Sequence, residues 1–116
     1  METNKEIAKI FEEITRLLEL KGDKAFAYKL RAYRNAIYVL NSLKKDISEI
    51  YREAGVDGIR ELGIGEKNAK KIEEYIKSSA KGNGKIKEFE KLKEETAIQK
   101  VIAFYFETKG LGLQEL

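Results

Sequence analysis

Residues 62–72 read Leu-Gly-Ile-Gly-Glu-Lys-Asn-Ala-Lys-Lys-Ile, and this stretch says most about how the chain folds. Two glycines, Gly63 and Gly65, flank the aliphatic Ile64, and a basic helical pattern begins directly after them. Glycine adopts backbone angles that other residues avoid and lets the main chain approach a ligand closely. A tight turn that opens a helix directs free N–H groups outward at the positive helix end. The pattern therefore predicts a phosphate-binding turn at Gly63-Ile64-Gly65.

The helix expected after this turn has two distinct faces. Ala69, Ile72 and Ile76 share one side of a helical wheel, and small Ala69 allows a second helix to approach closely. The lysines next to the turn lie on the other side: Lys67, Lys70 and Lys71. We interpret the whole as a helix-hairpin-helix that binds a nucleic-acid backbone. The alternative is a simple packing corner, since glycines often mark turns between helices.

The remainder of the chain has the apolar periodicity of amphipathic helices. The sequence thus predicts an all-α bundle of about four main helices with a short C-terminal helical extension. A DNA-binding domain is expected over residues 1–96 and an extension over 97–116. The first helix is expected to start at a capping box of Thr3 and Glu6 and to end at Lys21. Further helices are expected over 24–43, over 47–53 with a stop at Gly55, and over 66–79; a single turn capped by Asp57 leads to Leu62. After a loop at 81–84, the pattern predicts additional helices.

The C-terminal part is the least regular. Its last helix is expected to turn Ile98, Val101, Ile102 and Tyr105 inward, although the β-branched and aromatic residues of 97–106 also favour a strand. Gly110-Leu111-Gly112 repeats the glycine–aliphatic–glycine pattern, so we expect a second hairpin whose helix is cut away.

The composition excludes several kinds of chemistry. The 116 residues carry a formal net charge of +3 and include neither histidine nor cysteine. Histidine-based catalysis, histidine-ligated metals, cysteine metal sites and disulfides are therefore absent. The aspartates are far apart in sequence, so no paired carboxylates can hold the two metal ions of a nucleotidyl-transfer centre: Asp23, Asp46 and Asp57.

Charge and hydropathy also bear on location and partners. The pI of about 9.0 is compatible with a nucleic-acid partner. No apolar run approaches the roughly 18 residues of a membrane span. The polar, acidic start is unlike a signal peptide, so we expect a cytoplasmic protein.

Several segments together resemble one family. Gly63-Ile64-Gly65, with Ala69 and Ile72, resembles the helix-hairpin-helix of DNA repair proteins. Residues 25–36, Ala-Phe-Ala-Tyr-Lys-Leu-Arg-Ala-Tyr-Arg-Asn-Ala, resemble the second helix of the amino-terminal domain of family X DNA polymerases, which include polymerase beta. Residues 84–92 resemble the helix after that family's hairpin, and residues 110–112 stand where it has a second hairpin.

The resemblance implies specific roles. The family's small domain binds the 5′-phosphate side of a DNA gap, and some members excise a 5′-deoxyribose phosphate through a lysine Schiff base. By motif, Lys71 matches the nucleophilic lysine, and Lys67 and Lys29 match lysines that hold the 5′-phosphate. Tyr33 and Arg34 match a Tyr-Arg pair on the second helix.

Other observations qualify these roles. Tyr33 belongs to an apolar stripe and is expected to be buried, whereas Tyr28 is open to two readings, stacking on a template base or packing on a helix. Neighbouring cations could lower the pKa of Lys71 enough for Schiff-base chemistry. Two residues depart from the family pattern: Leu62 stands where proline is usual, and Glu88 where lysine is frequent. Acidic Glu66 lies directly at the hairpin, where its charge is unfavourable for an anion.

We therefore predict sequence-independent DNA binding at gaps or 5′ ends, by a monomer with no membrane partner. The predicted DNA contacts are Gly63, Ile64, Gly65, Lys67, Ala69, Lys70, Lys29, Tyr28 and Arg34. No cofactor or catalytic metal is expected, and the hairpin carbonyls could hold a structural monovalent cation. The alternatives are a 5′-deoxyribose-phosphate or abasic-site lyase that uses Lys71, and a helical protein-interaction module.

Overall fold

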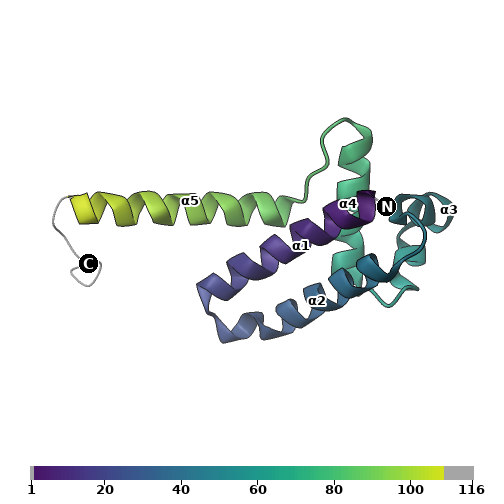
Figure 1. Ribbon diagram of the computed structural model, residues 1–116, viewed down its shortest axis with the longest axis horizontal. Coiled ribbons are helices and arrows are strands. Elements are labelled where there is room, and N and C mark those ends of the chain that lie inside the picture. The colour runs from purple at the N-terminus through teal and green to yellow at the C-terminus, as the bar shows by residue number, and fades with distance from the viewer. Residues whose placement is uncertain (1, 109–116) are drawn as a thin grey trace.

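Five α-helices and one short 3₁₀ turn form the part of the chain that the computed structural model describes, residues 2–108 (Figure 1). No strand occurs in this part, so the all-α prediction is confirmed and residues 97–106 are helical. The predicted second hairpin at Gly110–Gly112 lies outside the described residues. The elements are α1 (Glu2–Lys21), η1 (Lys24–Phe26), α2 (Ala27–Ser42), α3 (Ile47–Arg60), α4 (Glu66–Ala80) and α5 (Lys87–Thr108).

Helices α1 and α2 form an antiparallel pair that supplies much of the core (Figure 1). The Asp23 carboxylate accepts a hydrogen bond from the Ala25 N–H (2.9 Å) and so starts the η1 turn between them. Phe11 of α1 meets Tyr33 of α2 edge to face, with ring centroids 5.3 Å apart. Both rings are buried, which confirms the expected packing role of Tyr33.

A buried asparagine fixes the start of α1 against the loop before α3. The Asn4 amide donates to the Lys45 carbonyl (3.0 Å), and its oxygen accepts from the Ile47 N–H (2.8 Å). Since polar groups without partners are costly in a core, this pair of bonds lets a polar side chain stay buried there. It also holds the start of α3 against α1.

The α3 helix contains a sharp kink at Gly55. Gly55 has φ +66°, a conformation that favours glycine, which explains why the sequence predicted a helix end there. The chain then resumes a helix to Arg60. Asp57 does not cap this turn as expected; its carboxylate pairs with the Arg60 guanidinium (3.2 Å).

Two predicted helix boundaries are wrong. Helix α1 begins at Glu2, so Thr3 lies inside it and cannot act as the N-cap of a capping box. The helix expected from Lys24 begins with a 3₁₀ turn, and its α-helical part starts at Ala27. Terminal turns depend on local hydrogen bonds, which are the least predictable part of a helix.

The largest correction concerns the C-terminal segment. Helix α5 runs without a break from Lys87 to Thr108 and projects away from the other helices (Figure 1). The residues predicted to face inward are exposed, and only Ile102 among them shares a groove with α1, next to Leu17 and Leu20. The exposed fractions are Ile98 (59%), Val101 (68%), Ile102 (44%) and Tyr105 (54%). None of the helices within 2–108 is long and apolar enough to cross a membrane.

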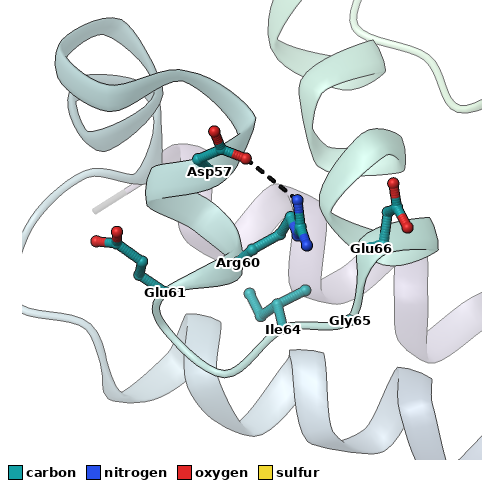
Figure 2. A pocket seen from close by; sticks show the side chains of 6 residues that line it. All are labelled: Asp57, Arg60, Glu61, Ile64, Gly65 and Glu66. Atoms are coloured by element: carbon teal, nitrogen blue, oxygen red, sulfur yellow. Dashed lines mark hydrogen bonds and ion pairs between the residues drawn. The ribbon is translucent and has the colours of Figure 1, made fainter.

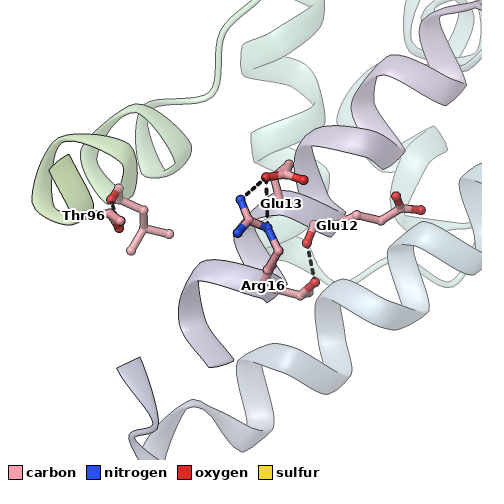
Figure 3. Close-up of polar contacts among 6 residues, drawn as sticks. Glu12, Glu13, Arg16 and Thr96 are labelled. Atoms are coloured by element: carbon pink, nitrogen blue, oxygen red, sulfur yellow. Dashed lines mark hydrogen bonds and ion pairs between the residues drawn. The ribbon is translucent and has the colours of Figure 1, made fainter. Parts of the chain in front are cut away.

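Only the first half of α5 is anchored. Leu92 is buried, and Glu95 forms an ion pair with Lys21 at the end of α1 (2.6 Å). Figure 3 shows that nearby polar side chains of the two helices bond within their own helix: Thr96 of α5 to the Leu92 carbonyl (2.9 Å), and Arg16 of α1 to Glu13 (2.6 Å). The contact between α1 and α5 thus fixes the start of α5, near the hairpin, and leaves its end free of the bundle.

Candidate nucleic-acid interface

The glycine turn joins α3 to α4 and has the geometry of a tight hairpin. Its first half continues the end of α3, because the Leu62 N–H donates to the Ile59 carbonyl (3.1 Å) and the Gly63 N–H to the Arg60 carbonyl (3.0 Å). Gly63 then takes φ +96°, which a residue with a side chain adopts only under strain. Ile64 is 2% exposed and anchors the hairpin in the core. Its predicted contact with DNA would therefore involve the main chain.

An asparagine on α2 holds the hairpin in place. The Asn35 side-chain amide donates to the Gly63 carbonyl at 2.9 Å. The sequence did not predict this role of Asn35, because no sequence pattern distinguishes an asparagine that bonds to a distant turn from any other asparagine on the exposed side of a helix. The bond ties the turn to the helix that carries Lys29 and Tyr28.

The second half of the turn presents free main-chain donors. Gly65 is the N-cap of α4, and its carbonyl accepts the first helical hydrogen bond, from the Ala69 N–H (2.9 Å). Within residues 2–108, the N–H groups of Gly65, Glu66 and Lys67 have no hydrogen-bond partner, and these three residues are exposed. Unpaired donors at the positive end of a helix attract anions. Gly63 does not contribute such a donor, because its N–H is paired.

A pocket of about 440 Å³ lies beside these donors. It lies where α2, the start of α4 and the start of α5 meet. Three cationic side chains and two carboxylates share it. The lining residues are Tyr28, Lys29, Ala32, Tyr33, Gly65, Glu66, Lys67, Asn68, Lys71 and Glu88.

Lys71 is the lysine of this pocket whose pKa is lowered. It is half-buried, and its Nζ lies 5.5 Å from the centroid of the Tyr33 ring. Burial lowers its pKa, the positive charges of Lys29 and Lys67 lower the pKa further, and Glu88 and Glu74 oppose the shift. Lys29 and Lys67, which the resemblance assigns to the 5′-phosphate, therefore both lower the pKa of Lys71.

The other residues predicted to contact DNA do not all lie at the pocket. Tyr28 is 79% exposed at the pocket, which leaves its ring accessible. Arg34 and Lys70 do not line the pocket: the Arg34 guanidinium pairs with Glu19 (2.6 Å), and the Lys70 ammonium pairs with Glu66 (3.6 Å). Ala69 is fully buried against the core, so it supports the hairpin from behind.

The opposite side of the hairpin carries a second, shallower depression (Figure 2). It is formed mainly by the last turn of α3, and it is acidic. Its lining side chains include three carboxylates and one cation, which is already paired with Asp57. They are Asp57, Arg60, Glu61, Ile64, Gly65 and Glu66.

The residues described hold no cluster of three or more metal-ligating side chains. A monovalent cation at the hairpin would have to use main-chain oxygens. The carbonyls of Gly63 and Gly65 already accept hydrogen bonds from Asn35 and Ala69, so such an ion would share them. The predicted cation site stays a prediction.

Comparison with known proteins agrees with this geometry. No curated protein and no solved structure matches the chain significantly. The helix-hairpin-helix domain family matches residues 2–80, which extend from α1 to the end of α4 and include the hairpin. Domains of this kind generally bind DNA without sequence specificity. Since the match covers more than half of the chain, this protein belongs to the helix-hairpin-helix domain family.

Proposed function

We propose that this domain binds DNA at gaps or 5′ ends, as the amino-terminal part of a family X repair polymerase. The observation that carries the proposal is the single pocket in which Lys29, Lys67 and Lys71 meet next to unpaired main-chain donors of the hairpin. A terminal phosphate is compact and doubly charged, so converging cations and N–H groups suit it better than they suit one phosphate of a continuous backbone. The sequence resemblance to family X supports the same interpretation.

The binding is expected to be insensitive to base sequence. The donors and cations of the pocket recognise phosphate oxygens, which carry no sequence information. The affinity should therefore fall steeply as salt rises, because each neutralised phosphate releases counterions. A nearly flat salt response would contradict the proposal.

The decisive test is a titration with two gapped duplexes that differ only in a 5′-phosphate at the gap. We expect tighter binding to the phosphorylated duplex. Gly65→Val combined with Lys67→Ala should abolish binding to both, since the added side chain would block approach to the free amides. A Cβ at Gly65 meets no atom within 4 Å and the residue has φ −63°, so the substitution leaves the hairpin unstrained.

A matched control comes from the same helix. Lys77 also lies on α4, but in its last turn and outside the pocket, where it pairs with Glu73 (3.9 Å). Lys77→Ala removes one positive charge, as Lys67→Ala does, and should change the affinity little. If the hairpin variant binds both duplexes as well as the wild type, the glycines form only a packing corner. The protein-interaction alternative would then be favoured.

A second candidate function, a 5′-deoxyribose-phosphate lyase, rests on the state of Lys71. A Schiff base forms when a neutral amine adds to the sugar aldehyde and water leaves, and the pKa of Lys71 is lowered by burial and by neighbouring lysines. Borohydride should then trap the wild-type protein on DNA with a 5′-deoxyribose phosphate. Trapping should disappear in Lys71→Ala and persist in Lys70→Ala, whose side chain lies outside the pocket. Trapping that survives in Lys71→Ala would exclude this lysine as the nucleophile.

A further inference from the structure

The pocket of the proposed phosphate site contains one acidic side chain that comes from outside the hairpin. Glu88 stands in the first turn of α5 and lines the pocket together with Lys29, Lys67 and Lys71. A carboxylate among lysines that would hold a phosphate weakens the attraction for an anion. A neutral polar residue would fit at this position of α5 without this cost, so the carboxylate of Glu88 needs an explanation.

The position of Glu88 is fixed by the three residues that precede it. The Lys87 N–H donates to the Glu74 carboxylate on α4 (2.8 Å), and the Lys85 N–H donates to the Ser78 hydroxyl (2.8 Å). Ile86 is 1% exposed and packs into the core. The first turn of α5 is therefore attached to α4, and Glu88 is held at the pocket by more than its own contacts.

The charge of Glu88 reaches the base of the pocket. Among the groups that raise the pKa of Lys71, Glu88 has the largest effect. After burial, its charge is also the second cause that raises the pKa of Tyr33. These effects act across the space that a ligand would occupy. A second acid in the first turn of α5, Glu90, lies outside this pocket and pairs with Lys93 (2.6 Å).

We propose that Glu88 is a specificity-determining residue of this pocket: its carboxylate opposes a doubly charged 5′-phosphate and so narrows the preference for a phosphorylated over a hydroxyl 5′ end. The inference rests on the proposed function. Three lysines and two carboxylates, Glu66 and Glu88, share the site, so its excess of positive charge is small. Such a pocket prefers the phosphorylated 5′ end only modestly, and removal of Glu88 should widen that preference.

The test compares Glu88→Gln with Glu90→Gln. Both variants remove one negative charge from the first turn of α5, and both weaken a favourable interaction with the helix dipole. Glu88 lines the pocket, whereas Glu90 lies outside it and pairs with Lys93. The measured quantity is the ratio of the dissociation constants for gapped duplexes with a 5′-hydroxyl and with a 5′-phosphate, at low salt.

We expect Glu88→Gln to raise this ratio about fivefold to tenfold, since a unit charge close to a dianion acts strongly in a partly desolvated site. Glu90→Gln should leave the ratio unchanged. Glu88→Lys, which reverses the charge, should raise it further. Circular dichroism and thermal unfolding verify that each variant is folded.

Two results would overturn the inference while leaving the proposed function intact. An equal gain in affinity for both duplexes in Glu88→Gln would mean that only the overall charge matters. Unchanged affinities for both duplexes would mean that the carboxylate does not act on the 5′ end. If the wild-type protein binds neither duplex, the proposed function fails first, and the role of Glu88 fails with it.

Discussion

The two sides of the hairpin share Gly65 and Glu66 and yet differ in what they offer to DNA. On the side of α2 and α5, three lysines surround a pocket. On the side of α3, the only cation, Arg60, is paired with Asp57, and Glu61 adds a further negative charge (Figure 2). Gly65 and Glu66, whose amides are free within the described residues, line both sides, whereas Lys67 lines only the pocket. A helix N-terminus alone therefore does not define an anion site, because the side chains around it decide from which direction an anion approaches.

The largest difference between the two sides of the hairpin should appear when one charge on each side is reversed. Lys67→Glu changes the pocket side by two charges and places a carboxylate beside the free amides. We expect at least a tenfold loss of affinity for phosphorylated gapped DNA, or about 1.4 kcal/mol, and a salt slope smaller by about one or more. Fluorescence anisotropy over a range of salt concentrations measures both.

Arg60→Glu is the matched control because it makes the same change of net charge on the α3 side. Its effect on affinity should be several times smaller than that of Lys67→Glu. Equal losses from the two reversals would show that DNA responds only to the overall charge of the domain, and the assignment of the interface to one side would be wrong.

The two glycines should separate the stability of the hairpin from its access to DNA. Gly63→Ala should destabilise the fold by about 1–2 kcal/mol, since a side chain is strained at positive φ, and Gly63 has φ +96°. Gly65→Ala should leave stability nearly unchanged, because Gly65 has an ordinary φ and an open surrounding. Urea unfolding of the two variants tests this. A larger loss in Gly65→Ala than in Gly63→Ala would contradict the described hairpin geometry.

The pH dependence should identify the contribution of Lys71 to the pocket side. Its pKa is lowered, so its positive charge is lost at lower pH than the charge of an ordinary lysine. As pH rises from about 8 to about 10, the preference for a 5′-phosphate should weaken about twofold to threefold in the wild type. It should stay constant in Lys71→Arg, because the guanidinium keeps its charge. Parallel curves for the two proteins would mean that Lys71 does not contact the phosphate.

The smallest effect is expected for Arg34, a predicted DNA contact that lies outside the pocket. Its ion pair with Glu19 is exposed, with 61% and 53% of the side chains accessible. Exposed pairs contribute about 0–1 kcal/mol to stability. We expect Arg34→Ala to change DNA affinity by less than about twofold, well below a single-phosphate loss. A loss as large as that of Lys67→Ala, measured in the same assay, would extend the interface along α2.

The sequence predicted the bundle well where local pattern and packing agree. The apolar stripe of α1, the break at Gly55 and the hairpin at Gly63–Gly65 all follow from residue type and spacing. The inward orientation of Ile98 and Val101 did not follow. An apolar helix face indicates that something should cover it, but the sequence does not say whether the covering surface lies in the same chain.

The site was predictable in part for a similar reason. Lys29 and Lys71 could be paired with Lys67 by resemblance, and the structure brings these side chains into one pocket. Asn35 could not be found, because its bond to Gly63 joins two segments that are distant in sequence. The acidic character of the α3 side was also invisible, since it depends on which way the end of α3 faces.

The most direct test is to follow the main-chain amides by nuclear magnetic resonance while a gapped, 5′-phosphorylated duplex is added. We predict the largest shifts at Gly65, Glu66 and Lys67, whose N–H groups have no partner within the described residues. The amides of Asp57 and Arg60, across the hairpin, should move much less. Large shifts along α3 with a silent start of α4 would contradict the account, because DNA would then approach from the acidic side or bind elsewhere.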